Sequence, residues 1–203
     1  MSEPRLDEKR FASRGGLKLD AALEHFGVDA GGAVCADLGC STGGFVDCWL
    51  QRGAARVYAV DTAYGELAWK LRQDQRVAVM ERTNALHAPP EEVAAEAAGA
   101  CGFVSLDLGW TKQDKAIPAA LRWLSDSSEA RIVSLIKPHY ESGRHKLTDP
   151  EADDQTRRVV QEVLPGLGVE VLGWIRSPIR GGKGKNLEHL ALLKKAGAEG
   201  PRG

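Results

Sequence analysis

Residues 33–45 read AVCADLGCSTGGF, an apolar run that ends on an acid and passes into a glycine-rich turn. The first six residues are typical of a buried strand, and the apolar residues after Gly44 indicate a helix. A strand, a glycine-rich turn and a helix in this order form the first unit of a doubly wound α/β fold, which binds ligands at the carboxyl ends of its strands. The stretch therefore predicts a parallel sheet with a ligand site at this turn.

The rest of the chain repeats the alternation of strands and helices. Six further strands are predicted at residues 56–61, 76–80, 102–107, 132–137, 168–176 and 187–193. Helices are predicted from Ser13 to Gly27, after Gly44, around 67–71, from Pro89, at 114–125 and at 149–164. Residues 138–150 are expected to form a polar loop. We expect one α/β domain at residues 13–195, an N-terminal extension at 1–12 and a flexible tail at 196–203.

The composition fits one globular domain and carries no global signal for nucleic acid or membrane. Of the 203 residues 43% are hydrophobic, and 27 basic residues nearly balance 28 acidic ones, for a net charge of −1. The sequence has neither a signal-peptide core nor an apolar run approaching the ~20 residues of a membrane span, so we expect a cytoplasmic protein without a membrane partner. The cysteines match no zinc-binding spacing, and we expect buried thiols and no metal at Cys35, Cys40, Cys48 and Cys101.

The acids and glycines around the turn indicate the kind of cofactor. Asp61 ends the second strand, where this fold places a carboxylate that accepts hydrogen bonds from the ribose of an adenosine. Gly39, Gly43 and Gly44 do not follow the G-x-G-x-x-G spacing of dinucleotide enzymes. S-adenosylmethionine carries no phosphate, and its amino and sulfonium groups favour a carboxylate such as Asp37. The pattern favours S-adenosylmethionine, with an ordinary glycine-rich turn as the alternative.

Four charged residues are expected at the edge of the sheet that carries the ligand. Asp107 and Lys137 end the fourth and fifth strands, Glu188 begins the last one, and Lys18 lies in the first helix. Any one of them alone is more often a solvated charge. A hydroxyl group is a poor nucleophile, so methyl transfer to it needs a group that takes its proton and a fixed in-line geometry. The topology predicts that these four residues converge on such a site.

Several stretches resemble the FtsJ/TlyA-like ribosomal RNA 2′-O-methyltransferases. The matching stretches are residues 13–19 (SRGGLKL), 37–45, 57–61, 65–72 (GELAWKLR), 79–84 (VMERTN), 137–144 (KPHYESGR) and 177–188 (SPIRGGKGKNLE). The resemblance covers residues 11–195. It implies a Rossmann-like class I methyltransferase fold with a mostly parallel seven-stranded sheet, its last strand antiparallel, and helices on both faces.

The resemblance also implies the roles of particular residues. It implies a catalytic tetrad of Lys18, Asp107, Lys137 and Glu188, in which Lys137 deprotonates a ribose 2′-hydroxyl of RNA. The S-adenosylmethionine site would fall on Asp37, Gly39, Ser41, Thr42, Gly43, Gly44, Phe45 and Asp61, with Thr83 and Asn84 near the adenine.

An RNA substrate, expected to be ribosomal RNA or a ribosomal subunit, needs a local basic surface because the chain is nearly neutral. Basic residues precede or follow three of the proposed catalytic residues, and the expected RNA contacts are Arg14, Arg144, Lys146, Arg180, Lys183 and Lys185. Trp110, Tyr140 and His139 are candidates for stacking on a base.

Two departures from the family bear on the substrate. TlyA-type members usually carry an N-terminal S4-like RNA-binding module, whereas this chain starts almost directly at the catalytic domain, so an RNA-binding partner protein is expected to assist. Residues 108–111 read LGWT where that subgroup usually has a serine and a phenylalanine, which allows a different target nucleotide. The alternatives are a small-molecule O-methyltransferase and a non-enzymatic RNA-interaction or haemolysin-type protein; the glycine spacing disfavours a dehydrogenase.

Overall fold

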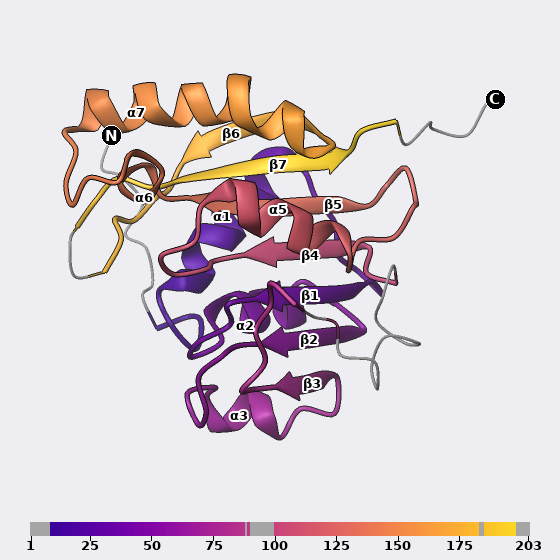
Figure 1. Cartoon of the computed structure of the whole chain (residues 1–203). Helices are drawn as coiled ribbons and strands as arrows, with labels where there is room; N and C mark the ends of the chain where they lie inside the picture. The colour runs from indigo at the N-terminus through magenta and orange to yellow at the C-terminus, as the bar shows by residue number, and fades with distance from the viewer. Residues whose placement is uncertain (1–8, 88, 90–99, 183–184, 198–203) are drawn as a thin grey trace, which may run out of the picture.

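One seven-stranded sheet forms the centre of the computed structural model, which describes residues 9–87, 89, 100–182 and 185–197 (Figure 1). The strands are β1 (Val34–Leu38), β2 (Arg56–Val60), β3 (Val77–Met80), β4 (Phe103–Leu106), β5 (Arg131–Ile136), β6 (Val169–Arg176) and β7 (His189–Lys195). Their order is β3-β2-β1-β4-β5-β7-β6. Strands β1 to β5 pair in parallel, and β7 is antiparallel to both β5 and β6. The predicted sheet is confirmed.

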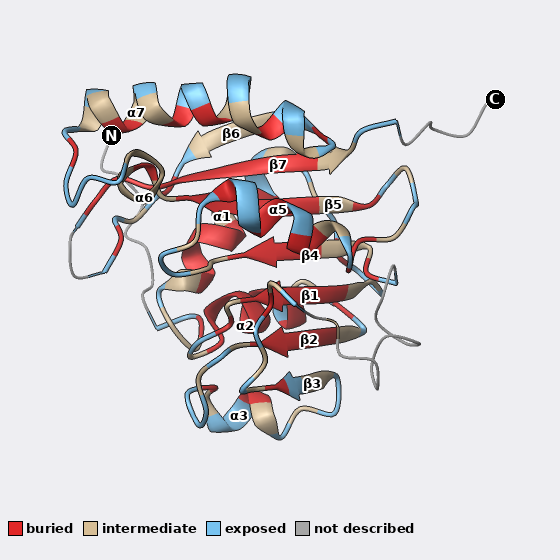
Figure 2. Cartoon of the chain, in the orientation of Figure 1, coloured by how far each residue is buried: buried red, intermediate tan, exposed pale blue. Residues whose placement is uncertain are grey.

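Helices cover both faces of this sheet. The helices are α1 (Gly15–Phe26), α2 (Gly44–Gln51), α3 (Trp69–Arg72), α5 (Gln113–Leu121), α6 (Pro138–Ser142) and α7 (Asp149–Arg158). Residues of α1, α2 and α3 share one apolar core with one face of the strands. Residues of α5, and of the irregular helical turns that continue α7 from Val159 to Leu167, share a second core with the other face. Figure 2 shows the buried strands between these two layers.

The ligand-binding edge follows from the strand order. The chain runs outward from β1 to β2 and β3 on one side, and from β4 to β5 on the other, while β1 and β4 lie side by side. The loops after β1 and β4 therefore diverge and leave a crevice at the carboxyl ends of these strands. The glycine-rich turn after β1 and Asp107 after β4 both lie at this position.

The structure contains a helix where the sequence predicted a loop. Residues 138–150 were expected to be irregular, but Pro138–Ser142 form α6. Pro138 occupies the first turn, where its missing N–H costs nothing, and Gly143 closes the helix with a left-handed φ of 71°. The Glu141 carboxylate accepts a hydrogen bond from the backbone N–H of Gln113 at 2.8 Å, which holds α6 against the start of α5. The prediction of a loop is therefore wrong for these five residues.

Other differences from the predicted elements are small. The helix expected around residues 67–71 is a single turn, α3, and α5 ends at Leu121 rather than near residue 125. The helix expected from Pro89 falls on residues 90–99, outside the described residues. Within the described part of the chain, no helix has the length and apolar character needed to cross a membrane.

Residues just before the predicted domain also contact it. Phe11 is buried in the core around α1 and α2, and the backbone N–H of Ala12 donates to the Asp47 carboxylate at 2.7 Å. Arg10 forms an ion pair with Asp20 of α1 at 2.5 Å. These contacts hold residues 10–12 against α1 and α2.

Candidate active site

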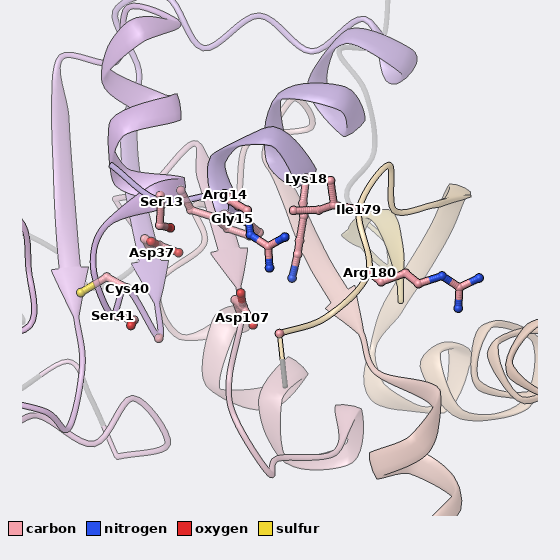
Figure 3. Close-up of a pocket in the computed structure, with 14 residues that line it drawn as sticks. Ser13, Arg14, Gly15, Lys18, Asp37, Cys40, Ser41, Asp107, Ile179 and Arg180 are labelled. Carbon is pink, nitrogen blue, oxygen red and sulfur yellow. The ribbon is translucent and has the colours of Figure 1, made fainter. Parts of the chain in front are cut away.

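A cavity of about 250 Å³ opens at the carboxyl ends of β1 and β4, below the first turn of α1 (Figure 3). Its lining combines the glycine-rich turn with the start of α1 and the loop before β7. The lining residues are Ser13, Arg14, Gly15, Lys18, Asp37, Gly39, Cys40, Ser41, Gly44, Phe45, Asp107, Ile179, Arg180 and Gly182. The cavity therefore lies where the sequence predicted the cofactor.

Asp37, at the end of β1, is a buried carboxylate with one oxygen unpaired. It is 1% exposed, and its Oδ1 accepts a hydrogen bond from the Ser105 hydroxyl at 2.8 Å. The Trp49 indole N–H donates to the same hydroxyl oxygen at 2.9 Å and so fixes its orientation. Oδ2 has no partner. An amino group bound in the cavity would supply the missing donor, so the site fits the amino group of S-adenosylmethionine.

The surroundings of Asp37 also change its protonation. Burial, together with the negative charges of Asp107 and Asp61, raises the pKa of this carboxyl to about 8, although the Ser105 hydrogen bond opposes the rise. A cationic ligand beside Asp37 would favour the ionised form.

Asp61 holds the glycine-rich turn against β2. Its Oδ2 accepts the backbone N–H of Ser41 and its Oδ1 accepts the backbone N–H of Ala63, each at 2.8 Å. Ser41 has a positive φ of 46°, so this hydrogen bond stabilises a conformation that non-glycine residues seldom adopt. Carboxylate oxygens accept more than one hydrogen bond, so Asp61 keeps acceptor capacity for ribose hydroxyls.

The glycines of the turn serve packing between elements. A Cβ on Gly39 would lie 2.6 Å from the backbone oxygen of Asp107, and one on Gly43 would lie 2.3 Å from a Leu71 methyl group. A Cβ on Gly44 would lie 2.3 Å from the Ser13 hydroxyl and 2.7 Å from the Gly16 nitrogen. From the sequence, the glycines were interpreted as leaving room for a ligand. In the structure, their lack of side chains also lets α1 and the end of β4 pack close to the turn, beside the cavity.

The structure brings the four predicted catalytic residues together as two ion pairs. Lys18 Nζ donates to Glu188 Oε2 at 2.7 Å, and both side chains are nearly buried. Lys137 Nζ donates to Asp107 Oδ1 at 2.5 Å and to the backbone oxygen of Leu108 at 3.2 Å. Lys137 is the N-cap residue of α6, so the helix that the sequence did not predict fixes the backbone from which the Lys137 side chain extends. We refer to these four charged residues as the tetrad.

The tetrad lies where the first cavity meets a second one of about 650 Å³. Lys18, Asp107 and Gly182 line both cavities. The other residues of the second cavity are Trp110, Lys112, Lys137, His139, Tyr140, Gly143, Arg144, His145, Gly181, Asn186 and Glu188. A Cβ on Gly181 would lie 2.4 Å from the Glu188 carboxylate, so the loop before β7 packs directly on this acid. A methyl donor in the first cavity and an acceptor in the second would meet at the tetrad.

The remaining residues predicted to bind cofactor lie outside the first cavity's lining. The backbone oxygen of Thr42 accepts the N–H of Ala68, which ties the turn to the start of α3. Thr83 donates its backbone N–H to the backbone carbonyl oxygen of Asp61 at 2.9 Å, and the Asn84 side chain accepts the backbone N–H of Leu86. Thr83 is thus adjacent to Asp61, and its proximity to adenine stays a prediction, as does that of Asn84.

Two of the residues predicted to contact RNA form ion pairs with acids of α7, and three more lie elsewhere in the described part of the chain. Arg144 forms an ion pair with Glu151 at 2.9 Å, and Arg180 forms one with Asp149 at 2.6 Å; both acids belong to α7. Arg180 is among the residues that line the first cavity, and Figure 3 shows its guanidinium pointing away from Lys18 and Asp107. Arg14 lines the first cavity, Lys146 and Lys185 are exposed, and Lys183 lies outside the described residues.

Sequence reasoning missed the residues that support Asp37. Ser105 and Trp49 are fully buried, and their hydrogen bonds connect α2 through β4 to the carboxylate of β1. Ser105 left a usable signal, because it is a polar residue inside an apolar strand and needs a buried partner. All four cysteines are buried, as expected, and burial raises the pKa of their thiols. The described residues contain no group of three acids, histidines or cysteines suited to a metal ion.

The fold and the cavity at the switch between β1 and β4 define an S-adenosylmethionine-dependent methyltransferase of the Rossmann-like class. The profile of the FtsJ-like methyltransferases matches residues 11–190, and the chain belongs to this family.

Similar proteins agree with this assignment. TlyA of Mycobacterium tuberculosis, named a 16S/23S rRNA (cytidine-2′-O)-methyltransferase, is 38% identical over 193 residues, which cover 92% of this chain and 69% of TlyA. YqxC of Bacillus subtilis, described as a candidate rRNA methyltransferase, is 39% identical over 96% of this chain and 69% of its own length. The crystal structure of a candidate hemolysin from Lactococcus lactis superposes with a TM-score of 0.83 at 39% identity, covering 96% of this chain and 93% of that one.

Proposed function

We propose that this protein transfers a methyl group from S-adenosylmethionine to a ribose 2′-hydroxyl of ribosomal RNA. The observation that carries the proposal is the tetrad of Lys18, Asp107, Lys137 and Glu188 at the junction of two cavities. The larger cavity gives the acceptor access to the tetrad. The names of TlyA and YqxC support RNA as the acceptor.

The residues of the first cavity would orient the methyl donor. Asp37 would accept a hydrogen bond from the donor's amino group through its unpaired oxygen, and Asp61 would accept from the ribose hydroxyls. When bound, S-adenosylmethionine supplies an electrophilic methyl group on a sulfonium centre. The buried surroundings of Asp37 limit competing water and strengthen its attraction for a cation.

The tetrad would then prepare the acceptor oxygen. Lys137 would first release a proton to solvent and would then, as the neutral amine, take the proton of the 2′-hydroxyl; the hydroxyl oxygen would gain the methyl group as the donor's carbon–sulfur bond breaks with its electron pair left on sulfur. Asp107 and the Leu108 carbonyl hold the Lys137 nitrogen in one place. Lys18 donates to Glu188 and has further N–H groups that can point at the ribose. Before Lys137 releases its proton, two cations and two anions make the tetrad neutral overall, which reduces the cost of its burial.

The surroundings of the site bear on the partners and the compartment. Because the chain is nearly neutral and Arg144 and Arg180 are already paired with acids, we propose that an RNA-binding partner protein adds affinity for the ribosomal substrate. Four buried free thiols are compatible with the reducing cytoplasm, the compartment that we propose.

Transfer of labelled methyl groups to unmodified ribosomal RNA tests the function. We expect the wild type to label RNA at nucleotides that resist alkaline cleavage, because a methylated 2′-oxygen cannot attack the adjacent phosphate. Lys137→Ala should lower the rate at least ~100-fold, as expected for the loss of a general base, without loss of cofactor binding. Lys115→Ala, which removes an exposed lysine of α5, is the matched control and should retain activity. If the wild type binds the cofactor but labels no RNA in isolation, the need for the partner protein is indicated; if it still labels none when a cell extract supplies partner proteins, the proposal is contradicted and a small-molecule acceptor is indicated.

A further inference from the structure

Gln113 is a buried polar residue at the start of α5, and its side chain contacts the end of β5. The residue is 3% exposed. Its Oε1 accepts a hydrogen bond from the Ser134 hydroxyl at 2.7 Å, and its Nε2 donates to the backbone oxygen of Leu135 at 3.3 Å. Because a backbone oxygen can only accept, the bond to Leu135 fixes which way the Gln113 amide points. The side chain therefore ties α5 to the last residues of β5 in one orientation.

The Gln113 amide supports β5 where a neighbouring strand ends. β4 pairs with β5 only as far as Leu106, which lies opposite Ser134, whereas β7 continues beside β5 to the end of the strand. Leu135, the next residue, has no partner in β4, and its backbone oxygen receives the amide N–H of Gln113 instead. A buried carbonyl without a donor is costly, so this hydrogen bond stabilises the strand at the point where β4 no longer does.

The backbone of Gln113 holds the helix that follows β5. Its N–H donates to the Glu141 carboxylate of α6 at 2.8 Å. Lys137, the N-cap residue of α6, lies between the two segments that Gln113 contacts, after Leu135 and before Glu141. The N–H groups of Tyr140 and Glu141 donate to the Lys137 backbone oxygen at 2.9 and 3.2 Å. A shift of either segment would therefore move the backbone of Lys137.

The groups that accept from the Lys137 amine belong to a loop that ends at Gln113. Asp107 Oδ1 and the backbone oxygen of Leu108 accept these hydrogen bonds, and residues 107–112 connect β4 to α5. β4 fixes the start of this loop, and the hydrogen bonds of Gln113 fix its other end against β5. One residue thus connects the backbone that carries the lysine with the loop that holds its nitrogen.

We propose that Gln113 is a positioning residue for the reaction and sets where the Lys137 nitrogen meets the acceptor hydroxyl. This inference rests on the proposed function and adds how the base is held in place. Gln113 lines neither of the two cavities, so its effect passes through Lys137 and the loop after Asp107 rather than through contact with a ligand. Misplacing a catalytic group by about 1 Å costs on the order of 100-fold in rate, which sets the size of the expected effect.

Methyl-transfer kinetics separate this role from general support of the fold. Gln113→Leu removes both side-chain hydrogen bonds and keeps the backbone N–H. Under conditions in which the wild type labels ribosomal RNA, kcat of this variant should fall about 10- to 100-fold, with an unchanged KM for RNA and an unchanged Kd for S-adenosylmethionine. Gln113→Glu should lose a similar factor, because its carboxylate places an acceptor against the backbone oxygen of Leu135.

Gln51→Leu is the matched control. Gln51 ends α2, and its amide donates to the backbone oxygen of Arg10 and to Asp47 Oδ1, each at 3.1 Å, so this variant also loses two hydrogen bonds. It touches neither β5 nor α6 through these bonds and should keep a normal kcat. An unchanged kcat in Gln113→Leu, an equal loss in both leucine variants, or a higher KM in place of the lower kcat would overturn the proposal.

Hydrogen exchange measures the same role without methyl transfer. The amides of Tyr140 and Glu141 report on the Lys137 backbone, because they donate to its oxygen. Their exchange, followed by mass spectrometry, should be at least several-fold faster in Gln113→Leu than in the wild type and unchanged in Gln51→Leu. Unchanged exchange in Gln113→Leu would overturn the proposal. If the wild type methylates no RNA, the proposed function fails, and the exchange of these two amides still decides whether Gln113 holds Lys137.

Discussion

At the scale of single residues, Asp37 connects burial to cofactor binding. Its carboxylate has no positive partner among the hydrogen bonds that surround it, and burial raises its pKa to about 8. At neutral pH the free protein therefore holds a proton on Asp37 that a cationic ligand would displace. Ionisation of the buried Asp37 carboxyl is therefore unfavourable in the free protein, and binding of the cationic methyl donor offsets this cost.

Asp37→Asn should change how the stability of the folded protein depends on pH. The pKa of Asp37 is higher in the folded state than in the unfolded chain, so the folded state loses stability as pH rises from about 4 to about 8. The variant lacks this loss, so its stability relative to the wild type should increase over that range, by an amount on the order of a few kcal/mol. Thermal denaturation between pH 5 and pH 9 measures the difference.

The same variant should lose affinity for the cofactor. Without a carboxylate to meet the amino group, Kd for S-adenosylmethionine should rise at least ~10-fold. Asp29→Asn, at an exposed position, serves as the control for both measurements. A stability difference that stays constant with pH, or an unchanged Kd, would contradict the role given to Asp37.

At the scale of elements, the contact between α1 and α2 places Lys18. Gly44 begins α2 and lies against the first turn of α1, with no room for a side chain. Lys18 lies one turn further along α1. Its side-chain nitrogen pairs with Glu188, which is 170 residues away in the sequence. A small shift of α1 would therefore move one ion pair of the tetrad.

Gly44→Ala should destabilise the protein and impair catalysis together. The added methyl group would meet the backbone of α1, and overpacking of this kind costs about 1–3 kcal/mol. A displacement of Lys18 by about 1 Å would lower kcat on the order of 100-fold. Gly166→Ala is the matched control, because a Cβ at Gly166 meets nothing within 4 Å. Chemical denaturation and methyl transfer measure the two effects; normal kcat in a destabilised variant would separate the α1–α2 contact from catalysis.

The elements also show what could be predicted from the sequence. The strands were predictable because most are short apolar runs between polar segments. Asp107 and Lys137 follow from the strand order because parallel strands end at one edge. Glu188 lies there because the antiparallel β7 begins at that edge, whereas the place of Lys18 on α1 does not follow from the strand order. The helix α6 was not predictable, because its five residues have no apolar periodicity and depend on Gly143 and on the contact between Glu141 and Gln113. The support of Asp37 by Ser105 and Trp49 depends on three elements that meet only in the folded protein.

At the scale of the whole molecule, the acids of α7 neutralise arginines of two neighbouring loops and of the end of β6. Three such pairs form a rim, namely Asp149 with Arg180, Glu151 with Arg144 and Asp153 with Arg176. The Arg180 guanidinium also lowers the pKa of Asp149, as expected for an ion pair. RNA phosphates would have to compete with these carboxylates for the same guanidinium groups.

This competition predicts opposite effects from the two members of one pair. Arg180→Gln should weaken RNA binding and reduce the dependence of the binding constant on salt by about one phosphate contact. Asp149→Asn should strengthen RNA binding by only a few-fold, because solvent screens an exposed ion pair and little attraction is lost with it. Filter binding of ribosomal RNA at several salt concentrations measures both variants.

Asp154→Asn provides the control, since Asp154 is an acid of the same helix whose partner Arg157 also lies on α7. It changes the net charge as Asp149→Asn does but leaves the loop arginines paired. If both aspartate variants strengthened RNA binding equally, only the total charge of the protein would matter. If Asp149→Asn alone did so, α7 would act as an internal competitor of RNA. A tightly bound RNA would then have to displace its acids, which would favour substrates that offer a phosphate at the position of each carboxylate.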